Sequence, residues 1–157
     1  MSIFVKATPA PKPRTTDAKK MAYFYAIILS IFALGQLFAF NDFITLLDSF
    51  WLPGDMPTAT LLGGVIVASE VFAIPFLIGI ALSPLMRYFS MFLSWLAPAI
   101  WLFISIWVNL NLNAITNIGF LGTKISITPG PWAILVCIAL GIMSTWSSWG
   151  LWPGKHK

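Results

Sequence analysis

The chain has 157 residues, of which 59% are hydrophobic and only 9% are charged. A soluble domain carries about 25% charged residues and cannot bury so many apolar side chains, so the composition excludes a soluble globular protein. The formal net charge of +4 comes from Lys and Arg outside the apolar stretches. We attribute it to membrane topology and contact with anionic lipid, and we expect no nucleic-acid binding.

Residues 1–20 are rich in Pro, Thr and Lys and show no helical period, which predicts a flexible basic cytoplasmic tail. Four apolar stretches follow, each close to the roughly 20 residues that a bilayer span needs: residues 21–40, 61–82, 91–108 and 132–151. We therefore expect residues 21–152 to form an all-α, four-helix transmembrane bundle, followed by a short cytoplasmic tail at 153–157. The first span is too long for a cleaved signal peptide and should remain as an anchor.

Basic residues lie mainly on one side of the predicted spans. Of the nine Lys and Arg, only Lys124 falls in a connection on the other side. Cytoplasmic segments of membrane proteins carry an excess of basic residues, so both termini are predicted to face the cytoplasm.

The first outer connection contains a short amphipathic pattern. Its apolar residues recur at helical spacing, on one face: Phe43, Leu46, Leu47, Phe50 and Trp51. This predicts a helix that begins at Asn41 or Asp42 and ends before Pro53 and Gly54. Two placements remain open, on the outer membrane surface or packed against the spans as a connector.

The other two connections differ in length. The link from Ser83 to Arg87 is tight, so the second and third spans must be antiparallel neighbours. In the second outer connection, residues 124–128 alternate in polarity, which predicts a short extended segment before a turn at residues 129–131.

One face of the fourth span consists of small residues. They follow spacings of three and four and share one direction: Ala133, Cys137, Gly141, Ser144 and Ser148. Small residues let helix backbones approach closely in lipid, so this stripe predicts a helix–helix packing face. Cys137 is the only cysteine, which excludes a disulfide within the chain.

Glu70 is the only charged residue well inside a predicted span. An acidic residue at a helix centre costs roughly 2.5–3.5 kcal/mol on insertion, so it needs a partner, a wet cavity or a proton. No span offers Lys, Arg or His, and we expect the carboxyl group to be largely protonated. Two interpretations stay open: proton handling or a hydrogen bond to a quinone-like ligand, and a neutral Glu that fixes helix packing.

Three other residues are candidates for ligand or proton binding beside Glu70. A depth count at 1.5 Å per residue puts Ser30 level with Glu70, and puts Gln36 nearer the outer surface. Arg87 would have to extend deeply from the cytoplasmic turn. Pro75 and Pro98 each free a backbone carbonyl near mid-membrane, so we expect a polar pocket there.

Other cofactor and catalytic signals are weak. Trp95, Trp101 and Trp107 step around the third span and form no stripe, and the remaining tryptophans are typical of an aromatic belt at the interfaces. The only histidine is His156, and no metal-ligand cluster, phosphate-binding loop or nucleophile triad is visible. We predict no metal site and no catalytic residue in this chain.

The order of these features resembles the DoxX family and its relative MauE, small four-helix membrane proteins of bacteria. The likeness rests on Gly35-Gln-Leu-Phe, then Phe43-Ile-Thr-Leu-Leu and Pro53-Gly54, then Glu70, Leu77 and Gly79 before the turn ending at Arg87. The resemblance implies an acidic site at Glu70, a basic turn at Arg87, and the bacterial inner membrane. It also implies a link to membrane redox systems, including quinone-coupled ones.

Two departures limit what the resemblance implies. Gln36 stands where such chains often have a basic residue or His, and Ile118 and Phe120 stand where MauE-like chains have cysteines. Autonomous oxidoreductase activity is therefore not expected. The leading hypothesis is an accessory subunit of a membrane redox complex that binds quinone or lipid near Glu70, with other membrane subunits or copies of itself as partners. The alternatives are a small oligomeric proton-coupled transporter and a structural assembly subunit.

Overall fold

The computed structural model describes residues 6–111 and 115–152. Within them all the named elements are helices: α1 (Thr16–Phe38), α2 (Phe40–Asp48), α3 (Asp55–Leu77), α4 (Pro84–Asn111) and α5 (Pro131–Gly150). The four helices other than α2 are long and apolar enough to cross a membrane. The predicted all-α four-span bundle with one short extra helix is therefore confirmed.

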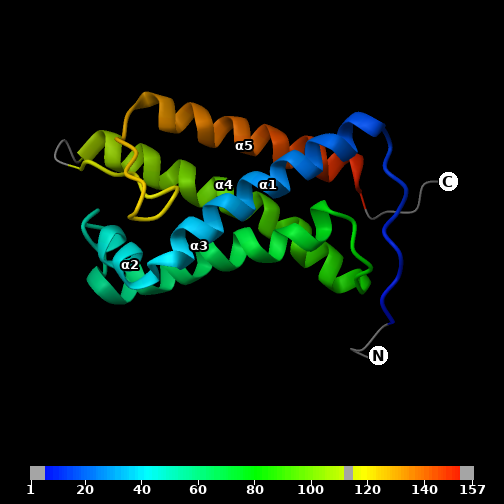
Figure 1. The fold of residues 1–157 in the computed structure, drawn as a ribbon, viewed down its shortest axis with the longest axis horizontal. Helices are drawn as coiled ribbons and strands as arrows, with labels where there is room; N and C mark the ends of the chain where they lie inside the picture. The colour runs from blue at the N-terminus through cyan, green and yellow to red at the C-terminus, as the bar shows by residue number, and fades with distance from the viewer. Residues whose placement is uncertain (1–5, 112–114, 153–157) are drawn as a thin grey trace.

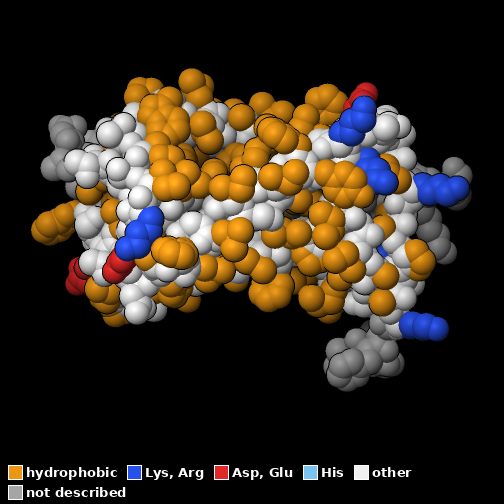
Figure 2. Space-filling model, in the orientation of Figure 1, with side chains coloured by type: hydrophobic (Ala, Val, Ile, Leu, Met, Phe, Trp, Pro, Cys, Tyr) orange, Lys and Arg blue, Asp and Glu red, His pale blue; other side chains and the backbone are white. Residues whose placement is uncertain are grey.

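The four long helices form a closed ring in which α1 contacts α3, α3 contacts α4, α4 contacts α5, and α5 contacts α1 (Figure 1). The first and last described residues lie at one end of the bundle, which we call the terminal end. The opposite end, which we call the loop end, carries α2 and residues 115–130. Apolar side chains cover the visible face between the two ends, and Lys and Arg gather at the terminal end (Figure 2).

The N-terminal segment differs from the predicted flexible tail. Helix α1 begins at Thr16, because the hydroxyl oxygen of Thr15 accepts a hydrogen bond from the Ala18 amide at 3.1 Å and caps the helix. Residues 6–15, which we call the strap, run across the terminal end. The Thr8 amide donates to the Leu82 carbonyl at 3.1 Å, and the Arg14 amide donates to the Gly150 carbonyl at 2.9 Å. The predicted C-terminal tail at 153–157 lies outside the described residues.

Helix α2 packs against the bundle as a connector. Phe43 and Leu47 are fully buried, and the absence of a side chain at Gly63 of α3 lets Leu47 approach closely. Trp51 departs from the predicted apolar face and is 78% exposed. The reason is that α2 ends at Asp48 and Trp51 adopts a positive φ of 53°, so the helical register does not reach it.

The second outer connection folds back into the loop end. The side chain of Asn117 organises it by donating to the Gly122 carbonyl at 2.9 Å and accepting from the amides of Gly119 and Ile127. Ile118 and Phe120 are thereby directed into the core, where both are buried. The predicted extended segment at 124–128 is not part of a named strand among the described residues, although the Ile118 amide bonds to the Ile127 carbonyl.

The backbone carbonyl that Pro98 frees is closed by side chains. The Ser94 carbonyl accepts hydrogen bonds from the Tyr25 hydroxyl at 2.7 Å and the Ser144 hydroxyl at 2.8 Å. Near Pro75, the Ser90 hydroxyl accepts from one backbone amide of α3 and donates to a backbone carbonyl one turn earlier. Side-chain hydroxyl groups thus satisfy the carbonyl that Pro98 frees, and the Ser90 hydroxyl bridges two backbone groups of α3 beside Pro75, at positions where we expected a polar pocket.

The small-residue face of α5 packs inside the chain itself. Four of its five residues are buried: Ala133, Cys137, Ser144 and Ser148. The Ser148 hydroxyl accepts from the Trp95 ring of α4 at 2.9 Å, and Cys137 lies 3.4 Å from the hydroxyl of Ser105. Gly141 is the exception, because a Cβ there would meet nothing within 4 Å.

Gly35 provides the closest approach between α1 and the second outer connection, and this contact can be tested. A Cβ at Gly35 would lie 2.7 Å from the Leu121 carbonyl oxygen, which is backbone and cannot rotate away. We expect Gly35→Ala to lower the free energy of unfolding by about 1–3 kcal/mol. Thermal unfolding in mild detergent would measure the change.

Gly141→Ala is the matched control, since it adds the same methyl group in a helix with open space around it. It should leave stability unchanged or raise it by up to about 1 kcal/mol through helix propensity. Equal melting temperatures for the two variants would contradict the packing described here.

Candidate functional site

Glu70 is fully buried where α1, α3 and α4 meet. Its Oε1 atom accepts a hydrogen bond from the Trp101 ring nitrogen of α4 at 2.9 Å and another from Nε2 of Gln36 of α1 at 3.1 Å. Nε2 of Gln36 also donates to the Phe120 carbonyl at 3.2 Å. We call Glu70, Gln36 and Trp101 the polar cluster.

The Gln36 amide is oriented by its acceptors. Both groups that face Nε2, the Glu70 Oε1 atom and the Phe120 carbonyl, accept hydrogen bonds. Rotating the amide by half a turn would place oxygen against two oxygens, so only the observed orientation satisfies them. Gln36 therefore ties α1 both to the carboxyl group of α3 and to the second outer connection.

Aromatic rings enclose the polar cluster on its loop-end side. The Trp101 ring lies edge-on to Phe120 at 4.9 Å and tilted against Phe43 at 6.3 Å. Phe120 in turn stacks on Phe32 of α1, with ring centroids 5.5 Å apart and an interplanar angle of 5°. Such rings lower the local dielectric constant, which strengthens the hydrogen bonds inside and makes any unpaired polar atom costly.

Two polar atoms of the cluster lack a hydrogen-bond partner among the described residues: Oε2 of Glu70 and Oε1 of Gln36. Both are buried acceptors when Glu70 is ionised. If Glu70 carries a proton on Oε2, that oxygen becomes a donor, and a carboxylic acid can then bond to a carbonyl-bearing ligand or to water. The arrangement thus leaves two hydrogen-bonding positions, at Glu70 Oε2 and Gln36 Oε1, unfilled by the described residues.

The structure brings together only some of the predicted site residues. Gln36 and Glu70 are in direct contact, as the sequence analysis allowed. The Ser30 hydroxyl instead donates to the Ala26 carbonyl of its own helix at 2.8 Å. Arg87 lies at the terminal end, where Nη2 donates to the carbonyls of Thr8, Pro9 and Leu82. No contact of either residue with Glu70 is found in the described part of the chain.

Trp101 is the member of the cluster that sequence reasoning missed. Because the three tryptophans of the third span form no stripe, the sequence pattern assigned none of them to a site. The available signal was different: an indole N–H inside a span needs an acceptor, and Glu70 is the only carboxylate within the spans. Trp101 is 1% exposed and meets that need.

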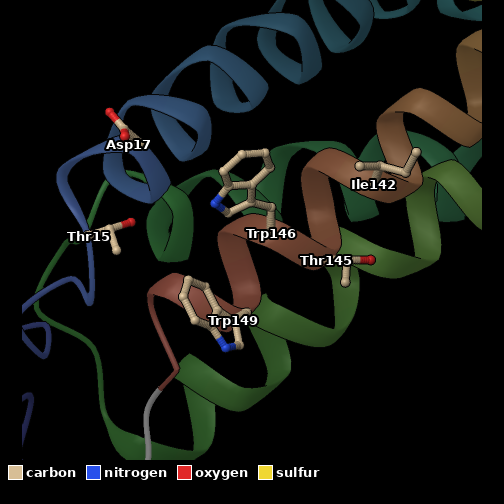
Figure 3. Close-up of a pocket in the computed structure, with 6 residues that line it drawn as sticks. All are labelled: Thr15, Asp17, Ile142, Thr145, Trp146 and Trp149. Carbon is tan, nitrogen blue, oxygen red and sulfur yellow. The ribbon is translucent and has the colours of Figure 1, made fainter.

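The described pockets lie away from the polar cluster. The largest, of about 580 Å³, is an open groove at the terminal end between the start of α1 and the last turns of α5 (Figure 3). Trp146 and Trp149 of α5 line it together with Thr15 and Asp17 at the start of α1. None of the four pockets described for residues 6–111 and 115–152 has Glu70 in its lining.

Metal binding has no support in the same part of the chain, where no group of three His, Cys, Asp or Glu residues is close enough to hold an ion. Comparison with protein-family models, curated proteins and solved structures finds no match to this chain.

The acceptor role of Glu70 predicts a difference between two substitutions. Glu70→Gln keeps an oxygen for Trp101 and Gln36, so we expect a free energy of unfolding within about 1 kcal/mol of the wild type. Glu70→Leu leaves the Trp101 N–H buried without an acceptor and should cost about 1–3 kcal/mol. Unfolding of both variants in the same detergent measures the difference in the free energy of unfolding. A Glu70→Leu variant as stable as Glu70→Gln would contradict the role of Glu70 as a hydrogen-bond acceptor.

Proposed function

We propose that this chain is a non-catalytic accessory subunit of a bacterial membrane redox complex, a DoxX-like integral membrane protein that binds the head group of a quinone at the polar cluster. The observation that carries the proposal is Glu70, a buried carboxyl group with two donors on one oxygen and no partner among the described residues on the other. Such groups inside a membrane protein are costly and usually serve ligand or proton binding.

The chemistry around Glu70 suits a quinone. Quinone carbonyls accept hydrogen bonds, and a protonated Oε2 of Glu70 would supply a donor, whereas the N–H groups of Trp101 and Gln36 already donate to Glu70 Oε1 and the Phe120 carbonyl. The ring of Phe120 already stacks flat against Phe32 beside them, so a flat aromatic head group would find the same stacking partner. Because Glu70 and Gln36 are fully buried, binding requires groups that cover the polar cluster to move.

The family resemblance supports the same proposal. Gly35 and Gln36, Glu70 and the turn ending at Arg87 are the positions that carry it. The first three lie at or beside the polar cluster, and Arg87 lies at the terminal end. A bacterial inner-membrane location follows from the resemblance. A redox partner, or a second copy of the chain, would bind the apolar outer surface of the bundle.

A proton-coupled transporter is the second candidate, and the unpartnered Oε2 atom of Glu70 favours it. It ranks lower because Phe43, Phe120 and Trp101 close the cluster toward the loop end. An assembly subunit that uses the small face of α5 ranks third, since α4 covers most of that face.

Quinone content after purification tests the leading proposal. We expect wild type isolated in mild detergent to retain quinone, and Glu70→Gln to retain about fivefold less, the equivalent of one hydrogen bond weakened by about 1 kcal/mol. Mass spectrometry of the extracted lipids measures the quinone content, and mass spectrometry of the co-purified proteins identifies partner subunits. Asp55→Asn is the matched control, because it removes a carboxylate from the exposed start of the same helix.

Equal quinone in the Glu70 and Asp55 variants would contradict binding at the polar cluster. If wild type and both variants purified as homo-oligomers with only bulk lipid, the redox-subunit proposal would be wrong. The proton-coupled transporter would then be the leading proposal.

The proposed orientation, with the terminal end in the cytoplasm, makes a separate prediction. In a Cys137→Ala background, a cysteine at Ser49 on the loop end should react with a membrane-impermeant maleimide in intact cells. A cysteine at Lys6 in the strap should react only after the membrane is permeabilised. Both positions are exposed, so accessibility in the protein itself does not limit labelling. The reverse pattern would invert the topology.

A further inference from the structure

A basic crevice lies at the terminal end, between the strap and the ends of α1 and α3. Its main chamber has a volume of about 240 Å³ and is lined by Lys12 of the strap, Lys19 and Tyr23 of α1, and Gly79 after α3. A smaller recess of about 10 Å³, lined by Arg87, shares Gly79 and part of the strap with the chamber. The two hollows therefore adjoin beneath the strap.

Positive charge in the basic crevice is not compensated by the protein. Arg87 is only 7% exposed, and its Nη2 atom donates to neutral oxygens: the Thr8 carbonyl at 2.7 Å, the Pro9 carbonyl at 3.0 Å and the Leu82 carbonyl at 3.3 Å. No carboxylate in the described part of the chain forms an ion pair with Arg87, Lys12 or Lys19. A buried cation without a counter-ion is costly, so an anion in the crevice would be stabilised.

Asp17, the acidic residue nearest along the chain, serves other contacts. Its carboxylate lies 3.9 Å from the ammonium of Lys20, and it lines the separate groove of Figure 3 on the α5 side of α1. The Lys19 ammonium is held instead 5.5 Å from the centroid of the Tyr23 ring. No carboxylate is among the residues that line the main chamber of the basic crevice.

The position of the crevice distinguishes a lipid from a soluble anion. Its lining combines Lys12 and Lys19 with the apolar residues Leu77 and Ile78. At the terminal end as a whole, Lys and Arg gather beside the apolar surface that covers the middle of the bundle (Figure 2). Tyr23, Ile78 and Ile80 beside it are all more than a third exposed, and in a membrane they face acyl chains. A ligand that is anionic at one end and apolar at the other would match both the basic lining of the crevice and the apolar surface beside it.

We propose that the basic crevice binds the phosphate group of an anionic phospholipid, with its acyl chains along the outer faces of α1 and α3. Lys12 and Lys19 contact the phosphate, while the recess has room for about one water molecule that links it to Arg87. Gly79 matters to this geometry, since its positive φ of 74° turns the chain under Ala10 of the strap.

The test compares lipid retention by the full-length chain in detergent, exposed to equal amounts of phosphatidylglycerol and phosphatidylcholine and analysed by native mass spectrometry. Wild type should retain phosphatidylglycerol preferentially. Each lysine near an anionic head group is worth about a fivefold change in binding, so Lys12→Gln with Lys19→Gln should weaken retention roughly 25-fold at low salt. All the substituted lysines are exposed, so folding should be unaffected.

Lys6→Gln with Lys20→Gln is the matched control, because it removes the same charge from the same end of the chain but outside the crevice. It should retain phosphatidylglycerol within about twofold of wild type. Equal losses in the two double variants would show attraction by surface charge alone and overturn the site. Displacement of the lipid by excess inorganic phosphate would also overturn the proposal, in favour of a free anion.

Discussion

Inside a bilayer every polar group has to find its partner in the protein, and the packing of this chain is arranged around that constraint. The Ser94 carbonyl shows how it operates. Pro98 removes the helical donor, and hydroxyl groups from two other helices, Tyr25 and Ser144, replace it. The same hydrogen bonds hold α1 and α5 against α4. The groups that satisfy the free carbonyl of α4 are therefore also contacts that assemble the bundle.

Glu70 extends the constraint from the backbone to a side chain. Donors from α1 and α4 converge on one of its oxygens, so the carboxyl group cross-links three helices. Its Oε1 atom accepts two hydrogen bonds, whereas its Oε2 atom has no hydrogen-bond partner among the described residues. A purely structural carboxyl group would gain from a donor on both atoms, and this asymmetry is why the polar cluster supports a ligand or proton role.

The sequence predicted the number and order of the spans because hydropathy over about 20 residues reflects the bilayer directly. The bounds of the second span are displaced, since residues 61–82 were predicted and α3 covers Asp55–Leu77. The sequence predicted the neighbours of Glu70 less well. The depth count that selected Ser30 assumes parallel spans that end at one level, but α1 crosses the bundle obliquely and brings Gln36, in its last turn, to the carboxyl group (Figure 1). The strap was missed because Pro-rich segments without helical period resemble disordered tails, and only tertiary contacts such as those of Arg87 order them.

The strap also constrains how the chain can be assembled. Its Arg14 amide bonds to the Gly150 carbonyl at the end of α5, and the Arg14 side chain lies over the Trp149 ring at 5.2 Å. The strap therefore completes its contacts with α5, the last of the described helices in chain order. The contact of Arg14 with Gly150 can form only after α5 has been synthesised, so this part of the terminal end closes after the other described helices have been made.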